Sequence, residues 1–187
     1  MGPVWRTSSR EVYANPWMTV REDAVRRADG SDGVYGVVDK PDYALVIPLE
    51  RGKIQLVEQF RYPLGRRRWE FPQGTAPERA ESAPRELAAR ELREETGLRA
   101  ASLTDLGALD VAPGLSSQRG RAFLATGLAR GEPERELEEQ DMRAAWFDRA
   151  AVEAMMSSEE ITDAQSIAAY ALLLLHERPH ERTATAD

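Results

Sequence analysis

The first sixty residues alternate between short β-rich runs and clusters of turn-forming residues. Glycine, proline and charged residues concentrate at 29–33, 40–42 and 50–53, where they favour chain reversals. The segments between these turns are rich in β-branched, aromatic and aliphatic residues, which favour extended chain. We therefore predict four β-strands, at residues 17–27, 34–40, 43–50 and 53–60.

The remainder of the chain mixes helical and strand-like periods. Charged and aliphatic residues at helical spacing predict a helix at about 83–96, and apolar alternation predicts strands at 103–111, 121–128 and 143–148. Two helices are expected to close the protein. One follows Asp148 as its N-cap, and the other begins with Thr162 and Gln165 spaced as a capping box. Helices among short hairpins indicate an α+β fold, with one mixed sheet covered by helices on both faces.

The helix at 83–96 has well-marked ends. Ser82 is the expected N-cap, Pro84 stands in the first turn, and Gly97 occupies the position of a left-handed C-cap glycine. At about 100° per residue, the expected buried stripe consists of Ala88, Ala89, Leu92 and Thr96.

Three carboxylates crowd one flank of this helix. Glu91, Glu94 and Glu95 lie within an arc of about 100°, and like charges at these spacings repel each other. Arg90, four residues before Glu94, offsets only part of this repulsion. Two interpretations remain open, an ordinary solvated helix face or a site for a hard divalent cation such as Mg²⁺. The tight loop expected at "FPQG" (71–74) would bring backbone carbonyls towards the same acids.

Composition limits the protein classes that fit. The 187 residues suit one domain, and 42% hydrophobic with 30% charged residues is typical of a soluble globular protein. The longest apolar run, at 168–175, is too short to span a bilayer. The chain has no cysteine, which favours a cytoplasmic location and leaves oxygen atoms or histidine to hold any metal. His176 and His180 are expected on the solvated surface.

The net charge of −7 argues against a general nucleic-acid binder. One local basic segment stands out at 61–69, "RYPLGRRRW", which contains Arg61, Arg66, Arg67 and Arg68. This segment is either a solvated basic turn or a group of phosphate contacts.

The segment "GTAPERAESAPRELAARELREETGL" (74–98) resembles the Nudix box. In this motif a glycine is followed by five residues, Glu, seven residues, Arg-Glu, an aliphatic residue, any residue, Glu-Glu, any residue, Gly and an aliphatic residue. The second half matches at every defined position, namely Arg90, Glu91, Leu92, Glu94, Glu95, Gly97 and Leu98. The first half is longer by two residues, because six residues separate Gly74 from Glu81 and eight separate Glu81 from Arg90.

The resemblance extends over about residues 10–177 and is closest to the ADP-ribose pyrophosphatase branch. It is carried by 56–74, by "APGLSSQ" at 112–118 and by the last helix at 161–175. Ala112 replaces a serine of that branch, and Gln118 stands where an acid is common. The loop "EFPQG" (70–74) of this chain also resembles the corresponding loop of bacterial RNA pyrophosphohydrolases.

The branch implies a Nudix-type α/β/α sandwich whose N-terminal strands take part in a homodimer. We accordingly expect a dimerisation element at 1–42, a Nudix hydrolase domain at 43–178 and a polar tail at 179–187.

The resemblance also implies roles for individual residues. Mg²⁺, with Mn²⁺ as a substitute, would be held by Glu91, Glu95, Glu94 and the main-chain carbonyl of Gln73, and Arg90 would orient Glu91. The general base would come from the acidic loop "RELEEQDM" (135–142), with Glu138 as first choice and Glu139 as second. Without the resemblance, this loop reads as a solvated charge run.

The substrate-binding residues expected by the same resemblance are Arg61, Trp17, Gly74 and Glu70. Arg61 would contact phosphate, Glu70 and Gly74 would line the site, and Trp17 would stack on the base. An exposed aromatic at a dimer seam explains Trp17 equally well.

The implied function is Mg²⁺-dependent hydrolysis of the diphosphate in a nucleoside diphosphate linked to another group, with ADP-ribose or a related nucleotide sugar as substrate. The same helix would serve an RNA 5′-pyrophosphohydrolase or a dinucleoside polyphosphate hydrolase. A non-catalytic nucleotide-sugar sensor is the remaining alternative, although Arg90, Glu91, Glu94 and Glu95 are all intact, which argues against it.

Overall fold

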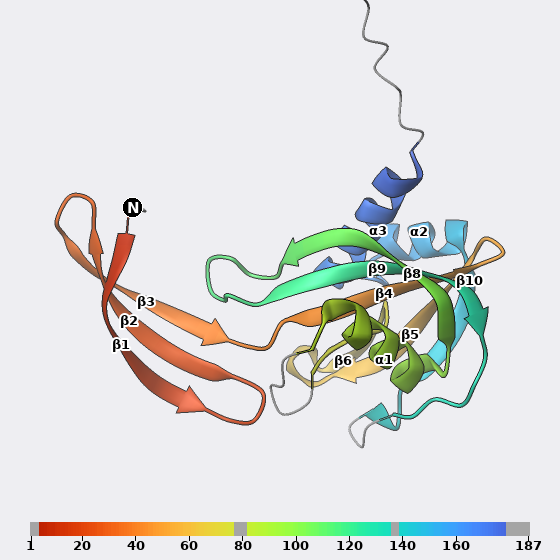
Figure 1. The fold of residues 1–187 in the computed structure, drawn as a ribbon, viewed down its shortest axis with the longest axis horizontal. Helices are drawn as coiled ribbons and strands as arrows, with labels where there is room; N and C mark the ends of the chain where they lie inside the picture. The colour runs from red at the N-terminus through yellow and green to blue at the C-terminus, as the bar shows by residue number, and fades with distance from the viewer. Residues whose placement is uncertain (1–3, 77–81, 136–138, 179–187) are drawn as a thin grey trace, which may run out of the picture.

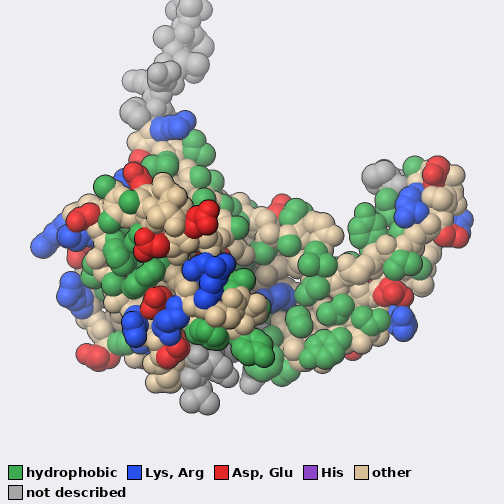
Figure 2. Space-filling view, turned by 180° about the vertical axis from the view of Figure 1, so that it is seen from behind, with side chains coloured by type: hydrophobic (Ala, Val, Ile, Leu, Met, Phe, Trp, Pro, Cys, Tyr) green, Lys and Arg blue, Asp and Glu red, His purple; other side chains and the backbone are tan. Residues whose placement is uncertain are grey.

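The computed structural model describes residues 4–76, 82–135 and 139–178 and contains two β-sheets (Figure 1). The first sheet has three antiparallel strands in sequence order: β1 (Val4–Ala14), β2 (Thr19–Arg27) and β3 (Asp32–Asp39). It extends away from the rest of the molecule as a curved arm. Hydrophobic side chains gather on the face of this arm that Figure 2 shows.

The second sheet forms the centre of the protein. It runs in the order β10 (Arg143–Asp148), β5 (Lys53–Arg61), β4 (Tyr43–Glu50), β9 (Arg119–Ala129), β8 (Arg99–Asp110), while β6 (Arg66–Glu70) pairs with β5 and β7 (Gln73–Thr75) pairs with β4. Strands β4 and β9 are parallel, and the other pairs are antiparallel. The predicted mixed sheet is thus confirmed.

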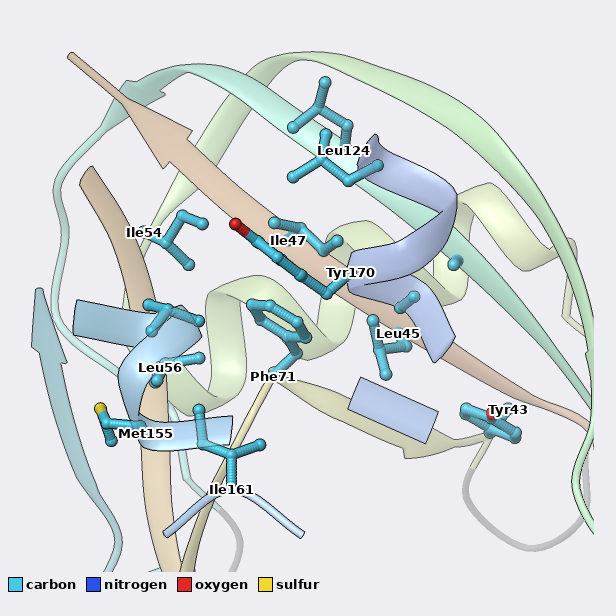
Figure 3. Close-up of a cluster of buried hydrophobic side chains, with 14 residues drawn as sticks. Tyr43, Leu45, Ile47, Ile54, Leu56, Phe71, Leu124, Met155, Ile161 and Tyr170 are labelled. Carbon is cyan, nitrogen blue, oxygen red and sulfur yellow. The ribbon is translucent and has the colours of Figure 1, made fainter. Parts of the chain in front are cut away.

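Strand β4 explains how this sheet holds helices on both faces. Its alternate side chains Ala44 and Val46 pack with α1 (Pro84–Thr96). Leu45 and Ile47 point the other way, towards α2 (Arg149–Ser157) and α3 (Ala164–Glu177) (Figure 3). All four side chains are fully buried, which is why this strand reads as a continuous apolar run. The predicted α+β sandwich is confirmed.

The C-terminal end of α1 agrees with prediction, and its N-terminal end differs. Gly97 adopts the left-handed conformation with φ 74°, and a Cβ there would overlap the backbone of Gly131, so glycine is required. The N-cap, however, is Ala83, whose side chain cannot cap, and not Ser82. Ala89 was also wrongly placed in the core, because the buried face is shifted towards Leu87 and leaves Ala89 exposed.

The N-cap of α3 is one residue later than predicted. Asp163, not Thr162, caps this helix, and its Oδ2 accepts a hydrogen bond from the backbone N–H of Ser166 at 2.8 Å. Three strands were missed. Residues 4–14 and 66–70 are too polar to show a β pattern, and the expected loop at 71–74 continues into the short strand β7. None of the described helices combines the length and apolar character needed to cross a bilayer.

Candidate active site

A cavity of about 650 Å³ opens where β5, β6 and β7 meet α1 and the beginning of α3. This volume is in the range of small-molecule sites. Eight of the residues predicted for the site line it: Trp17, Arg61, Glu70, Gln73, Gly74, Glu91, Glu94 and Glu139. Two others, Arg90 and Glu95, are not in its wall, and Glu138 lies outside the described residues, as does Glu81.

The acids of α1 are not an ordinary solvated helix face. Glu91 is 5% exposed and Glu95 is 1% exposed, whereas Glu94 is half-buried. Burial raises the pKa of Glu91 to about 7, although the hydrogen bond and charge of Arg90 oppose the shift. Burial also raises the pKa of Glu95 well above its usual range, and the charges of Glu139 and Glu91 add to this. The helix therefore buries carboxyl groups that are costly to ionise in the protein alone.

Arg90 fixes the orientation of two of these acids. Its Nη2 donates to Oε1 of Glu91 at 3.0 Å and to the carbonyl of Thr75 at 2.9 Å, and its Nε lies 3.4 Å from Oε2 of Glu94. Since Thr75 ends β7, this arginine joins the helix to the neighbouring strand. Arg90 thus lies beside Glu91, and its role in orienting this acid during catalysis stays a prediction.

Two features of the site suit a bound cation. Oε1 of Glu95 is buried and has no hydrogen-bond partner among the described residues. A Cβ at Gly74 would overlap the carboxylate of Glu91, so glycine lets this carboxylate approach the backbone of β7. Carboxylate oxygens are the ligands that hard divalent cations prefer.

The acids are not yet arranged around one point. Among the described residues, no three acidic or histidine side chains are placed to hold a metal ion. Arg90 and Arg93 account for this at Glu94, because both form ion pairs with its carboxylate. The carboxylate oxygens of these acids fit a divalent cation in their chemistry.

Gln73 connects the acids to the beginning of α3. Its backbone N–H donates to Oε2 of Glu95 at 3.3 Å, and its side-chain Nε2 donates to Oδ2 of Asp163 at 3.1 Å. The same Oδ2 accepts from the hydroxyl of Ser166 at 2.7 Å, and this hydroxyl oxygen accepts from the backbone N–H of Phe71 at 2.9 Å. The loop before α1 is therefore held against α3 by a continuous chain of hydrogen bonds.

The buried carboxylate of Glu70 is matched by Arg61. Nη2 of Arg61 lies 2.6 Å from Oε1 and Nε lies 3.1 Å from Oε2, which is a two-pronged contact. Gln59 donates to Oε1 at 2.5 Å. Burial raises the pKa of Glu70, while the charge of Arg61 acts against this rise. Both residues line the cavity, and their predicted role in substrate binding stays a prediction.

The three consecutive arginines of the basic segment occupy different environments. Arg66 is exposed, and Arg68 lines the cavity. Arg67 points away from the cavity, where it pairs with Glu58 at 2.9 Å and with Asp141 at 2.5 Å. Residues 66–70 therefore form a β-strand with alternating faces, and the predicted solvated turn describes only residues 62–65 of the segment, which are exposed.

The described ends of the acidic loop are anchored next to the site. Arg135 donates from Nε to the carbonyl of Glu95 at 3.2 Å and from Nη1 to the carbonyl of Met142 at 2.5 Å. The backbone N–H of Glu134 donates to the carbonyl of Glu94 at 2.9 Å. Glu139 lines the cavity, so this part of the loop faces the site.

Several cavity residues were not predicted from the sequence, among them Lys40, Tyr43, Gln118 and Asp163. Burial raises the pKa of Tyr43, and the charge of Asp163 adds to this effect. These residues come from segments up to about 120 positions apart, and no local motif relates them. Trp17, from the bend between β1 and β2, is 67% exposed and lines the cavity of its own chain.

Comparisons with known proteins agree with this geometry. The profile of the NUDIX domain matches residues 39–170, and the profile of the nucleoside diphosphate sugar hydrolase N-terminal domain matches residues 6–38. An ADP-ribose pyrophosphatase of Mycobacterium tuberculosis (strain ATCC 25618 / H37Rv) is 37% identical over 171 residues, covering 90% of this chain and 81% of that protein. An ADP-ribose pyrophosphatase of Bacillus subtilis (strain 168) is 30% identical over 175 residues, covering 91% and 92%.

A solved structure gives the same result for the fold. The crystal structure of an ADP compounds hydrolase superimposes with a TM-score of 0.83 over 94% of this chain and 95% of that chain, at 20% identity. Nudix hydrolases generally use divalent metal ions, in keeping with the buried acids of α1. This chain is a member of the Nudix family and a hydrolase of phosphoric anhydride bonds.

Proposed function

We propose that this protein hydrolyses the diphosphate of ADP-ribose, or of a closely related nucleoside diphosphate sugar, in a reaction that depends on Mg²⁺. Addition of water across the phosphoric anhydride of ADP-ribose gives AMP and ribose 5-phosphate. The two ADP-ribose pyrophosphatases, similar over about nine-tenths of this chain, support this choice of substrate. The observation that carries it is one cavity that joins the acids of the Nudix helix to the arginines of β5 and β6.

The charge of the cavity supports the requirement for a divalent cation. Among the described residues, its wall contains five carboxyl groups but three cationic side chains, those of Lys40, Arg61 and Arg68. A diphosphate is itself anionic, so the protein alone would repel its substrate. Glu91 and Glu95, with Glu94 and the carbonyl of Gln73, would hold Mg²⁺, and Mn²⁺ would substitute. A bound ion neutralises phosphate oxygens and lowers the pKa of coordinated water.

The other residues of the site would position the reactants. Arg90 holds Glu91 and Glu94 in place through the contacts described above. A glutamate of the acidic loop would accept a proton from the attacking water, and either Glu138 or Glu139 is placed by sequence to do so. Glu139 has support from its place in the cavity wall and from the effect of its charge on Glu91 and Glu95. Trp17 offers an exposed ring at the cavity for the base.

The proposal is tested by measuring AMP and ribose 5-phosphate from ADP-ribose with Mg²⁺, with Mn²⁺ and with a chelator. Glu95→Gln should abolish nearly all turnover while the protein stays folded, because the change is almost isosteric and removes a ligand charge. Glu86→Gln is the matched control, since Glu86 is an exposed acid in the first turn of the same helix. Wild-type turnover by Glu95→Gln at saturating Mg²⁺ would show that the metal assignment is wrong.

A substrate screen separates the proposal from its alternatives. Besides ADP-ribose it should contain other nucleoside diphosphate sugars, dinucleoside polyphosphates and RNA with a 5′-triphosphate. Selective cleavage of the RNA would replace the proposed function by an RNA 5′-pyrophosphohydrolase. Binding of nucleotide sugars without hydrolysis at any Mg²⁺ or Mn²⁺ concentration would indicate a sensor.

A further inference from the structure

The β5–β6 hairpin places four polar side chains in the wall of the cavity. Side chains along a strand alternate between two faces, so Gln59 and Arg61 of β5 share the cavity face with Arg68 and Glu70 of β6. Strand pairing sets Gln59 opposite Arg68. The cavity thus receives two arginines and one carboxyl group from this hairpin.

Only one of these two arginines, Arg61, forms an ion pair with a carboxylate of the described residues. Arg61 is engaged by both oxygens of Glu70, at 2.6 and 3.1 Å, and Glu70 is 1% exposed. Removing Arg61 from this contact would leave a buried carboxylate unpaired, which is unfavourable. The charge of Arg61 is therefore largely neutralised by Glu70, and two of its N–H groups are already used in this contact.

Arg68 lacks such a partner. Within the described ranges it forms no ion pair, and its Nε is buried without a hydrogen-bond acceptor. Its one hydrogen bond is long, 3.4 Å from Nη1 to the carbonyl of Arg67. A guanidinium group has five N–H donors in a fixed plane, and a buried donor without an acceptor is costly. Arg68 thus brings a positive charge without an ionic partner among the described residues to the wall of the cavity.

We propose that Arg68 binds the diphosphate of the substrate in this cavity. Arg61 would act beside it while it stays paired with Glu70. The planar donors of Arg68 would contact non-bridging phosphate oxygens of the substrate, an arrangement that guanidinium groups favour. This inference rests on the proposed function for the identity of the ligand. It assigns a substrate contact to the last of the three consecutive arginines, whereas the family resemblance singled out Arg61.

The test uses the full chain with α,β-methylene-ADP in the presence of Mg²⁺, because the methylene bridge of this diphosphate analogue is not hydrolysed. Isothermal titration calorimetry should show a dissociation constant about 10- to 100-fold higher for Arg68→Gln than for the wild type. Arg68→Lys should lie between them, since it keeps the charge but loses the planar donors. Binding of adenosine, which has no phosphate, should be unchanged in both variants.

Arg66→Gln is the matched control, because Arg66 is on the same strand, is exposed and does not line the cavity. It changes the net charge by the same amount and should leave the dissociation constant within about twofold of the wild-type value. Circular dichroism of each variant checks the fold, and Arg68→Lys keeps the test valid if Arg68→Gln does not fold.

The outcomes distinguish this inference from the proposed function. Unchanged analogue affinity in Arg68→Gln, together with an unchanged KM for ADP-ribose, would overturn the role of Arg68 and leave the hydrolase intact. Loss of analogue binding in Arg68→Gln, in a wild-type protein that cleaves no nucleoside diphosphate sugar, would support Arg68 and overturn the proposed substrate.

Discussion

At the scale of single residues, the distinctive feature of this protein is a helix that buries two carboxyl groups. Glu91 and Glu95 lie on the side of α1 that faces the protein, next to the fully buried Leu92 and Ala88. Because burial raises both pKa values, ionising these groups costs free energy when no cation is bound. The buried carboxylates therefore lower the stability of the metal-free protein, and they would be available as ligands for a cation.

This effect of burial predicts how the stability of the metal-free protein depends on pH. The pKa of Glu91 is about 7 in the folded protein and near 4.5 in the unfolded chain, so the unfolded state loses its proton first as pH rises. Stability is accordingly lost between these two values. In EDTA, Glu91→Gln should remove a penalty of at most about 3 kcal/mol at pH above 7 and change little near pH 4.

Thermal unfolding at about pH 5 and about pH 8 measures this effect. Glu86→Gln serves as the control, since it removes an exposed acid of the same helix. Adding Mg²⁺ should then stabilise the wild type more than Glu91→Gln, by mass action on the folded state. Identical pH profiles of the wild type and Glu91→Gln in EDTA would contradict the assignment.

Local spacing was sufficient to find the acids of α1 but not their surroundings. Glu91, Glu94 and Glu95 occupy one turn of a helix, so the helical period alone brings them together. The contact of Glu70 with Arg61 depends on the pairing of two strands, and that of Gln73 with Asp163 joins positions 90 residues apart. Such contacts follow from tertiary packing, which no local pattern encodes.

At the scale of elements, the acidic loop is defined by the two arginines that hold its ends. Arg135 donates to the carbonyls of Glu95 and Met142. The guanidinium of Arg67 donates to the carboxylate and to the backbone carbonyl of Asp141. The loop is therefore fastened both to the end of α1 and to β6. Such anchoring fits a segment that carries a group acting on the substrate.

We expect one glutamate of this loop to act as the base. Substituting the base by glutamine should lower kcat by about 10²-fold or more and change the apparent Mg²⁺ affinity much less. Glu139→Gln and Glu138→Gln are compared by titrating Mg²⁺ at saturating ADP-ribose. Glu91→Gln is the contrasting variant, because losing a ligand charge should weaken Mg²⁺ binding.

The result decides between three assignments. A severe loss in only one of the two variants identifies the base. Near wild-type kcat in both would mean that the base lies elsewhere and that the loop is a solvated run of charges.

The elements that were missed share a physical cause. Strand β6 consists of three arginines followed by Trp69 and Glu70, and it is stabilised by pairing with β5, by ion pairs and by the packing of Trp69 alone against the core. Strand β1 is exposed along most of its length for a similar reason. By contrast, β4 and α1 bury apolar faces, and their positions were predicted to within a residue.

At the scale of the whole molecule, the three-stranded sheet buries too few apolar side chains to account for its stability as an extended arm. Val34 and Tyr35 are neighbours on β3, so they point to opposite faces of the sheet, yet both are exposed. Val12 and Tyr13, at an irregularity of the β1–β2 pairing, are also exposed. Exposed apolar surface on both faces of an extended sheet indicates a surface that is covered by another chain.

We therefore expect a homodimer that covers this sheet. Sedimentation equilibrium at tens of micromolar should give twice the chain mass of 20.9 kDa. The combined change Val34→Glu and Tyr35→Lys should shift the protein to monomers, because it places charges on the covered surface. Leu175→Glu is the control, since Leu175 is an exposed hydrophobic residue on α3. A wild-type monomer at these concentrations would argue strongly against the dimer.

The placement of the four tryptophans has a further consequence, for spectroscopy. Trp5 and Trp17 are exposed in the N-terminal region, whereas Trp69 and Trp146 are partly buried in the central sheet. Indole emission moves to shorter wavelength when the ring leaves water. Dilution of the protein should therefore change the emission of the first pair alone, and a nucleotide stacked on Trp17 should quench one of the two. The intrinsic fluorescence of this chain should thus report the expected assembly and nucleotide binding without any added label.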